Sequence, residues 1–371
     1  MNKLRILFVT EAFNGGIYRF LLGLANRLTD RAQIYIAYED NHRTSMVCRE
    51  DFAPEVQLIP LEQGFSSHRN LNCLAGICKY RELVRKLQPD VIHLHSSIAG
   101  MWGRWAFLNN PCPVFYTPHG FAFLNGRPRW KMVIYRWMER ISACRPCRII
   151  ACGKQEYQIA LKFRKDSVCV LNGIPTEELQ MLPGSTDRGR KGQLQVLTVS
   201  RNVWQKNPAL FNTIAGQMPD VAFVWVGDEK KDTLSAENIE ATGLLGHEET
   251  IRRVKHADIF LLTSVFEGLS LALLEAMALG RICIVSDVPG NREVITNGVN
   301  GYLCSGAEDF VKTIRMVEQA DEATLEQIRS NAYRTVMNTY SVEKMAEQYY
   351  SIYLDAVSSQ KNLSKGRQLI E

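Results

Sequence analysis

The stretch from Phe266 to Gly280 constrains the fold and the chemistry of this chain more than any other. Glu267 and Gly268 follow an apolar, strand-like run, and a strongly apolar helical segment begins soon after them. We expect Ser270 to cap that helix and Glu275 to lie one to two turns inside it. Both carboxylates would then border a pocket at the carboxyl end of a strand, where open α/β sheets bind ligands. The free N–H groups at the start of the helix would face an anion.

A simpler interpretation is that these acids serve only the helix dipole and solvation. The helix contains Leu271, Leu273 and Leu274, however, and is therefore expected to be largely buried. A carboxylate at Glu275, among such residues, is costly unless something pairs with it. This cost favours a functional role for the acidic pair.

The length of the chain predicts two domains. Its 371 residues are too many for one ordinary core. Short apolar runs alternate with amphipathic segments, which predicts an α/β fold of parallel sheets joined by right-handed crossovers. We expect two doubly wound, Rossmann-like domains facing each other across a cleft. We place the two domains at residues 1–182 and 194–340, joined by a polar, glycine-rich linker at residues 183–193. Residues 341–371 are expected to form a terminal helix, whose polar tail frays from Ser358 onward.

The expected strands are short and rich in apolar or β-branched residues. In the first half they cover residues 5–10, 33–38, 56–59, 91–95, 114–117, 148–152 and 168–171, and in the second half 196–200, 222–226, 259–263 and 282–286.

Several classes of protein are disfavoured by composition. No apolar run is long enough to span a membrane, and the N-terminus enters a strand without the layout of a signal peptide. We therefore expect a cytoplasmic protein. Cys144 and Cys147 have the spacing of a redox or metal motif, but no second Cys or His pair accompanies them. We interpret them as part of a turn between a helix and a strand.

The positive charge of the chain is concentrated in its first half. Residues 1–175 hold 24 Lys and Arg against 13 Asp and Glu, whereas the remainder holds 20 against 26. Between Arg104 and Arg148, eight basic residues meet one acid and are interleaved with aromatic side chains. This composition suits an anionic membrane surface, and a helix that is half core and half solvated is an equal alternative. Nucleic-acid binding is disfavoured, because no motif for it is present.

Two loops have the residues that a phosphate group requires. The first strand leads through Gly15 and Gly16 into a helix, and paired glycines let backbone N–H groups approach a phosphate closely. The second domain opens with Arg201 and Lys206 around a short loop after a strand. A forked guanidinium and an ammonium can hold a diphosphate while a bond to it breaks. Two solvated loop cations are the alternative.

A histidine follows the strand at residues 114–117. His119 stands between Pro118 and Gly120, which permits an unusual turn that aims the imidazole into the expected cleft. We favour a functional role for it. His93 and His95 alternate on one strand and share a face, and we interpret both as satisfied strand-end histidines.

Taken in order, these motifs resemble those of the family 4 retaining glycosyltransferases, which have the GT-B fold. The resemblance spans nearly the whole chain, and the signature is a pair of carboxylates separated by seven residues. The matching positions are Gly15-Gly16, His119-Gly120, Asn172-Gly173-Ile174, Arg201 with Lys206, Val226-Gly227-Asp228, Leu245-Gly246, Glu267 with Glu275, and Gly290 with Glu293.

The resemblance implies a role for each matching residue. Arg201 and Lys206 would neutralise the leaving diphosphate, His119 would contact the sugar near its reacting carbon, and Glu275 would hold the ribose hydroxyls. The donor sugar and its phosphate would contact Glu267 and the backbone of Gly268, Leu269, Ser270 and Leu271. Gly15 and Gly16 would pack against the diphosphate, and Leu245 and Gly246 would lie beside the base.

The activity implied is that of a retaining hexosyl- or N-acetylhexosaminyl-transferase in the synthesis of bacterial surface polysaccharide. The donor would be a nucleotide-diphosphate sugar, with UDP expected, and neither a metal nor another cofactor would be needed. The acceptor would be a lipid-linked glycan, which places the protein on the inner face of the membrane as a peripheral protein. Alternatives are a nucleotide-sugar epimerase or hydrolase on the same fold, and a non-catalytic subunit that binds the nucleotide-sugar.

Overall fold

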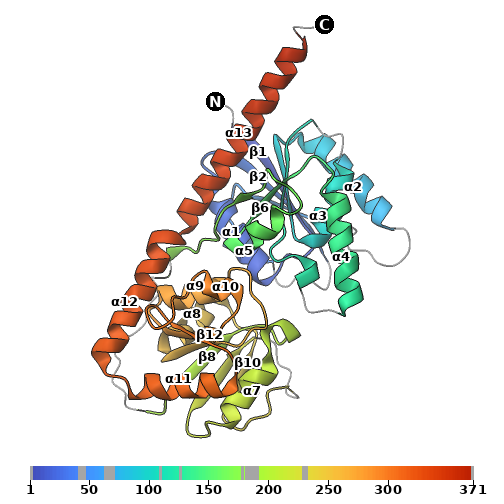
Figure 1. Ribbon diagram of the computed structural model, residues 1–371. Coiled ribbons are helices and arrows are strands. Elements are labelled where there is room, and N and C mark those ends of the chain that lie inside the picture. The colour runs from blue at the N-terminus through green and yellow to red at the C-terminus, as the bar shows by residue number, and fades with distance from the viewer. Residues whose placement is uncertain are drawn as a thin grey trace. The chain divides into compact units, whose positions relative to one another are not determined.

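The computed structural model describes residues 3–40, 47–61, 72–107, 111–124, 128–176, 179, 192–227 and 233–368 (Figure 1). The chain divides into two compact units. Unit 1 comprises Met1–Gly173 together with Val342–Glu371, and unit 2 comprises Ile174–Ser341. Ile174 already belongs to unit 2, because its backbone N–H donates to the carbonyl of Tyr340 and it forms a bridge with Ser341.

Unit 1 is built on a seven-stranded parallel sheet in the order β3-β2-β1-β4-β5-β6-β7. The order reverses between β1 and β4, so the carboxyl ends of these two strands flank a topological switch point. The strands are β1 (Leu4–Thr10), β2 (Ala32–Glu39), β3 (Gln57–Leu61), β4 (Val91–His95), β5 (Val114–Thr117), β6 (Arg148–Ala151) and β7 (Val168–Cys169). The helices are α1 (Gly15–Leu28), α2 (Asn72–Leu87), α3 (Ser97–Ala106), α4 (Arg129–Ser142), α5 (Lys154–Ala160) and α13 (Val342–Gln368), with short 3-10 turns η1 (Arg49–Asp51) and η2 (Ala122–Leu124).

Unit 2 contains a six-stranded parallel sheet in the order β10-β9-β8-β11-β12-β13, and its switch point lies between β8 and β11. The strands are β8 (Gln195–Val199), β9 (Ala222–Val226), β10 (Ile239–Gly243), β11 (Ile259–Leu262), β12 (Ile282–Ser286) and β13 (Tyr302–Cys304). The helices are α7 (Pro208–Gly216), α8 (His247–His256), α9 (Leu271–Ala278), α10 (Pro289–Arg292), α11 (Ala307–Gln319) and α12 (Glu322–Thr339), with the 3-10 turn η3 (Trp204–Lys206).

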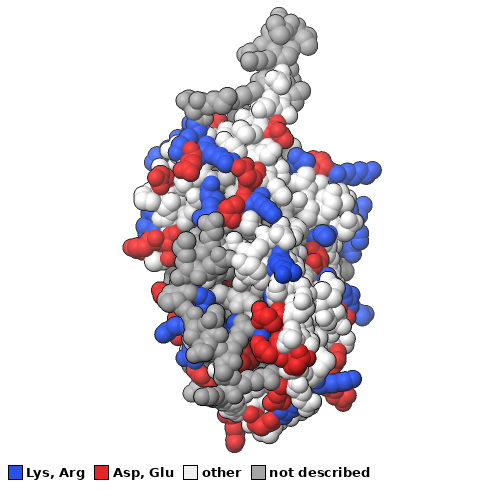
Figure 2. Space-filling model, turned by 90° about the vertical axis from the view of Figure 1, so that its left-hand side faces the viewer, with Lys and Arg blue, Asp and Glu red and all other residues white. Residues whose placement is uncertain are grey.

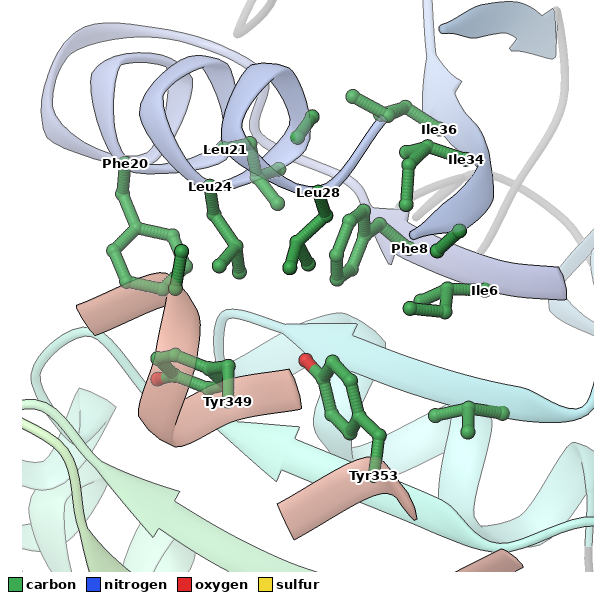
Figure 3. Close-up of a cluster of buried hydrophobic side chains, with 14 of the residues drawn as sticks. Ile6, Phe8, Phe20, Leu21, Leu24, Leu28, Ile34, Ile36, Tyr349 and Tyr353 are labelled. Carbon is green, nitrogen blue, oxygen red and sulfur yellow. The ribbon is translucent and has the colours of Figure 1, made fainter. Parts of the chain in front are cut away.

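The terminal helix α13 is part of the core of unit 1. Its buried residues recur every three or four positions, so they form one stripe along the helix. Tyr349 and Tyr353 lie against Phe20 and Leu24 of α1 in one buried cluster (Figure 3). The two helices approach so closely that a Cβ at Gly23 would stand 2.9 Å from Val342. The hydrophobic effect of burying this stripe holds the end of the chain on unit 1.

The α/β class and most strands agree with the sequence-based expectation, with three differences. Strands β10 and β13 were not predicted, because β10 contains only one strongly apolar residue, Ile239, and β13 is three residues long. The tail expected to fray from Ser358 continues as helix to Gln368, since it has no proline to stop it. Most of the expected linker lies outside the described residues.

A buried chain of hydrogen bonds joins α13 to the middle of the sheet of unit 1. Tyr353 Oη lies 2.6 Å from His93 Nδ1, and His93 Nε2 lies 2.9 Å from Thr117 Oγ1. The Thr117 hydroxyl donates to the carbonyl of Ile150 at 2.9 Å, so it must accept from His93 Nε2–H. His93 is therefore the neutral Nε2–H tautomer, and the Tyr353 hydroxyl donates to its Nδ1.

We expect Tyr353→Phe to lower the stability of unit 1 by about 1–3 kcal/mol, because His93 Nδ1 would be buried without a donor. Hydrogen exchange of the β4 and α13 amides in the full chain measures this opening free energy. Tyr350→Phe on the same helix is the matched control. Equal protection in the two variants would contradict the assigned hydrogen bond.

Candidate functional site

In unit 2, a lysine and a buried carboxylate meet at the switch point between β8 and β11. Lys206 Nζ donates to Glu267 Oε1 at 2.6 Å, and the Ser264 hydroxyl donates to the same oxygen at 2.5 Å. The side chains of Lys206 and Glu267 are 16% and 6% exposed, respectively. An ion pair that is this well shielded from solvent is stronger than one on the surface, because water screens it less.

Backbone contacts hold the two loops that carry this pair together. The Val265 N–H donates to the carbonyl of Gln205 at 2.8 Å. The Gln205 side-chain amide donates to the carbonyl of Phe266 at 3.2 Å. The Thr263 hydroxyl bonds the carbonyls of Lys206 and Asn207 at 3.0 and 3.2 Å. The loop after β8 and the loop after β11 therefore form one preorganised element.

A glycine at α10 packs directly on the backbone of the carboxylate loop. A Cβ on Gly290 would stand 1.9 Å from the carbonyl oxygen of Gly268 and 2.4 Å from that of Glu267. No side chain fits at such distances, so glycine is required there for close backbone approach. The start of α10 thereby supports the position of Glu267 from behind.

The helix that follows the carboxylate loop begins as the sequence indicates. Ser270 is the N-cap of α9, and its hydroxyl accepts from the Leu273 N–H at 3.4 Å. Glu267 and Gly268 lie in the loop, and Glu275 lies in the second turn of the helix with part of its surface exposed. The sequence predicted a burial cost for the carboxylate of Glu275. The structure shows that Glu267, which is 7% exposed and paired with Lys206, is the more deeply buried of the two carboxylates.

The side chain of Arg201 differs from that of Lys206 in its environment. Arg201 lies two residues after the end of β8 and is exposed. Within the described part of unit 2, its guanidinium makes no hydrogen bond or ion pair. Leu245 and Gly246 follow β10, with Gly246 as the N-cap of α8. Leu245 is half-buried and Gly246 is exposed.

In unit 1, the start of α1 presents backbone to open space. Gly15 has φ of +49°, a conformation that favours glycine, and neither Gly15 nor Gly16 would bring a Cβ within 4 Å of another group. The preceding residue, Asn14, makes no side-chain cap. The backbone at the start of α1 is therefore exposed and not crowded by neighbouring side chains.

A buried glutamate supports this switch point from inside. Glu11, at the end of β1, accepts hydrogen bonds from the Ser96 hydroxyl and from the Ala99 N–H, the latter at 3.1 Å. Burial raises the pKa of Glu11, which the bonds from Ser96 and Ala99 partly oppose. The carboxyl group joins the end of β1 to the start of α3, and no sequence pattern singled it out.

His119 occupies the unusual turn that its neighbours indicated. His119 has φ of +52° and Gly120 has φ of +96°. His119 Nε2 lies 3.0 Å from His95 Nδ1, and the two rings are stacked with centroids 5.3 Å apart. Burial lowers the pKa of His119 to about 3 and that of His95 well below its usual value. Both imidazoles are therefore neutral near pH 7.

A second buried glutamate, Glu156, holds the His119 turn. One oxygen accepts from the Gly120 N–H at 2.7 Å, and the other accepts from the Cys152 N–H at 2.8 Å and from the Cys152 thiol at 3.0 Å. The thiol proton is thus directed to Glu156, which leaves the sulfur as acceptor for His119 Nδ1–H at 3.8 Å. The imidazole is held by His95 on one side and by Cys152 on the other.

Sequence reasoning missed the supporting residues of both sites. Ser264, Glu11 and Glu156 are single polar residues without a motif, and only the structure shows which groups they bond.

The expectation that His95 is a satisfied strand-end histidine is wrong in part, because its Nε2 is buried without a hydrogen bond. The interpretation of Cys144 and Cys147 as part of a turn is confirmed, since they lie between α4 and β6 as free cysteines.

Among the described residues, no cluster of three or more His, Cys, Asp or Glu side chains could hold a metal ion. Nor does any helix in the described ranges combine the length and the apolar character needed to cross a bilayer.

Comparison with known proteins defines the class of the fold. A sucrose-phosphate synthase from Thermosynechococcus elongatus is similar over 96% of this chain and 100% of its own, with 17% identity and a TM-score of 0.80. The Anabaena protein HepE in complex with UDP-glucose is similar over 96% and 100%, with 18% identity and a TM-score of 0.77. Together with the two parallel-sheet units, these likenesses show the GT-B fold.

Sequence comparison shows the family. The model of "Glycosyltransferase Family 4" matches residues 14–178, and that of "Glycosyl transferases group 1" matches residues 171–335. The UDP-Gal:alpha-D-GlcNAc-diphosphoundecaprenol alpha-1,3-galactosyltransferase of Escherichia coli is 30% identical over 305 residues, which cover 74% of this chain and 78% of that protein. The chain belongs to glycosyltransferase family 4. It is an enzyme that transfers hexosyl or N-acetylhexosaminyl groups, as the sequence motifs indicated.

The three neutral histidines make the stability of unit 1 depend on pH. Burial lowers the pKa of His93, His95 and His119 from the usual 6.5, so the unfolded chain binds protons that the folded unit does not. Stability is therefore present above pH 6.5 and is lost as the pH falls below it. Each histidine contributes up to about 1.4 kcal/mol per pH unit, and Glu11, whose pKa is raised, can offset one of the three.

We expect hydrogen exchange in β4 and β5 to accelerate between pH 6.5 and about 5, after correction for the intrinsic rate, while exchange in the unit 2 strands β8 and β11 stays constant. A pH-independent opening free energy in β4 would contradict the assignment of neutral histidines.

Proposed function

We propose that the enzyme transfers a sugar from a UDP-sugar to a lipid-linked glycan, with retention of the anomeric configuration. The observation that carries the proposal is the shielded Lys206–Glu267 pair at the β8–β11 switch point. The loop that carries Lys206 also carries Arg201, whose guanidinium is exposed and has no partner among the described residues. Open α/β sheets bind ligands at such points. A cation already positioned by a carboxylate, with a second cation free to move, suits a diphosphate that leaves with negative charge.

The physical demands of sugar transfer agree with this site. Positive charge develops on the sugar ring and negative charge on the departing diphosphate. Arg201 and Lys206 would stabilise the phosphate, and the start of α9 would add its free N–H groups. Glu267 would contact the donor sugar, together with the backbone of the segment from Gly268 to Leu271.

Further residues would complete the donor site. Glu275, in the second turn of α9, would hold the ribose hydroxyls, and Leu245 with Gly246 would lie beside the base. UDP is supported by two comparisons, because the similar Anabaena structure contains UDP-glucose and the Escherichia coli relative is named for UDP-Gal. We accordingly assign residues 194–340 as the nucleotide-sugar-binding domain.

Unit 1 would supply the remaining groups. The open backbone at Gly15 and Gly16 would approach the diphosphate, and His119 would contact the sugar near its reacting carbon. Because His119 is neutral, it would donate or accept a hydrogen bond there without adding charge. We assign unit 1 as the acceptor-side domain. The boundary expected at residue 182 lies beyond Gly173, where the first segment of unit 1 ends, and the terminal helix from Val342 returns to unit 1.

The acceptor is proposed from a relative. The Escherichia coli galactosyltransferase is named for a diphosphoundecaprenol-linked sugar. By analogy, this enzyme would act in polysaccharide assembly (O-antigen or capsule) at the cytoplasmic face of the membrane, as a peripheral protein.

Removing the free cation tests the proposal most directly. We expect Arg201→Ala to fold normally but to lower kcat by about 10²–10³, as loss of one transition-state donor does. Transfer from UDP-sugars to a lipid-linked acceptor, followed by mass spectrometry, measures this. Arg334→Ala, another exposed arginine of unit 2, is the control. Lys206→Ala should also abolish transfer, although it leaves Glu267 buried without its cation. Turnover near that of the unmodified enzyme in Arg201→Ala would reject the site.

A glycine substitution tests the proposed approach of backbone to diphosphate. Gly16→Ala places a methyl group in empty space within α1, so we expect stability to stay the same or to rise by up to about 1 kcal/mol. The KM for the donor should nevertheless increase at least about tenfold, which corresponds to about 1.4 kcal/mol of lost binding. Gly216→Ala in α7, equally open, is the matched control. An unchanged KM would place the donor elsewhere.

Product analysis separates the alternatives. A hydrolase or epimerase would release free sugar or an epimer without an acceptor, and a non-catalytic subunit would bind UDP-sugar without turnover. Nuclear magnetic resonance of the product reports whether the anomeric configuration is retained.

A further inference from the structure

Helix α4 of unit 1 exposes a continuous apolar surface. Trp130 and Trp137 are 62% and 63% exposed, and three aliphatic residues between and after them are about half exposed. At 100° per residue all five positions fall within an arc of about 100° on the helix. We call them the α4 stripe: Trp130, Val133, Ile134, Trp137 and Ile141.

A buried ion pair fixes the orientation of this helix. Glu139 lies opposite the α4 stripe on the helical wheel and points inward, where its Oε1 lies 2.9 Å from Arg104 Nη1 of α3. The two side chains are 7% and 1% exposed, and the guanidinium also stacks on Tyr116 and donates to the carbonyl of Gly100. Rotating α4 to bury the stripe would expose the pair and separate it, so the structure specifies an outward stripe.

The charges beside the stripe are all of one sign. Arg129, Arg136 and Arg140 line one edge, and Lys131 lies at the other with its ammonium 5.1 Å from the Trp130 ring centroid. The only acid of α4 is the inward-pointing Glu139. By contrast, Figure 2 shows a face on which basic and acidic side chains are interspersed.

The structure also separates the aromatic residues around α4 into two groups. Phe121 is buried in the core, and Trp105 lies beneath the guanidinium of Arg145 while its indole N–H donates to Ser142. Only Trp130 and Trp137 among the tryptophans of this region are strongly exposed. The solvated-helix alternative therefore fails for α4, because its solvent-facing side is apolar at the centre.

We propose that α4 is the membrane-docking element of this enzyme and lies in the plane of an anionic lipid surface. Its 14 residues extend about 21 Å, so the helix can lie along a bilayer but cannot cross one. The α4 stripe enters the boundary between headgroups and acyl chains, with both indoles at headgroup depth. The flanking arginines and lysine bind the lipid phosphates.

Lipid suits this surface better than another protein does. The apolar α4 stripe is flanked within its own helix only by cations, and the one acid of that helix points inward. The apolar side chains match the acyl chains of an anionic bilayer, and the cations match its phosphates. The biological reason for membrane docking rests on the proposed lipid-linked acceptor. The binding of α4 to lipid does not, because it can be measured without donor or acceptor.

The test is flotation of the full chain with vesicles of phosphatidylcholine alone or mixed with phosphatidylglycerol. We expect binding to the anionic vesicles, with a blue shift of tryptophan fluorescence. Trp130→Ser combined with Trp137→Ser should weaken binding at least about tenfold and abolish the shift. Arg136→Gln combined with Arg140→Gln should weaken binding chiefly at low salt, because only the electrostatic part is lost.

The matched control combines Val299→Ser with Met316→Ser, which removes two exposed apolar side chains from unit 2 and should leave binding unchanged. Equal flotation of the tryptophan variant and the unmodified protein would overturn the proposal. So would self-association through α4 without vesicle binding, measured by sedimentation.

The same variants separate this proposal from the proposed function. Arg201→Ala should float with anionic vesicles like the unmodified protein. The tryptophan variant should retain transfer to a short-chain acceptor dispersed in detergent. Loss of transfer to every acceptor with intact flotation would reject the catalytic assignment and leave the docking surface standing.

Discussion

The ion pair between Lys206 and Glu267 is the interaction on which the site of unit 2 depends. It lies at the switch point between β8 and β11, and four loop-to-loop hydrogen bonds and the close packing of Gly290 hold its backbone in place. A buried carboxylate without a cation is costly, so Glu267 and the ammonium of Lys206 hold each other in position. Arg201, on the same loop as Lys206, is exposed, and its guanidinium has no hydrogen-bond or ion-pair partner among the described residues.

The buried histidines of unit 1, by contrast, are neutral. Burial suppresses the charge of His93, His95 and His119, and all of their ring nitrogens except His95 Nε2 take part in hydrogen bonds. The two acids near them, Glu11 and Glu156, accept bonds from backbone N–H groups and hold turns with unusual dihedral angles. The switch point of unit 2 thus carries positively charged side chains, whereas that of unit 1 carries neutral imidazoles.

The sequence predicted the α/β architecture and the loops that carry the candidate site, because hydrophobic periodicity and strand-to-helix turns are local signals. It also indicated the cap at Ser270 and the turn at His119. No sequence pattern pointed to Ser264, Glu11 or Glu156, because none of the three belongs to a motif. Nor could the sequence show which of the two carboxylates is the more deeply buried. Glu275 lies in the more apolar segment, yet Glu267 is the more deeply buried. Short edge strands such as β13 carry too few residues to register as a pattern.

The path of α13 has a consequence for biosynthesis. Tyr349 and Tyr353 complete the core of unit 1, yet they follow unit 2 in the chain and leave the ribosome after it. A nascent chain that has emerged only as far as Ser341 holds the described strands of both sheets but still exposes the apolar side chains of α1 that α13 covers. Unit 2 can therefore fold before α13 emerges, whereas the core of unit 1 is complete only afterwards, and in that interval its exposed apolar surface is a binding site for chaperones.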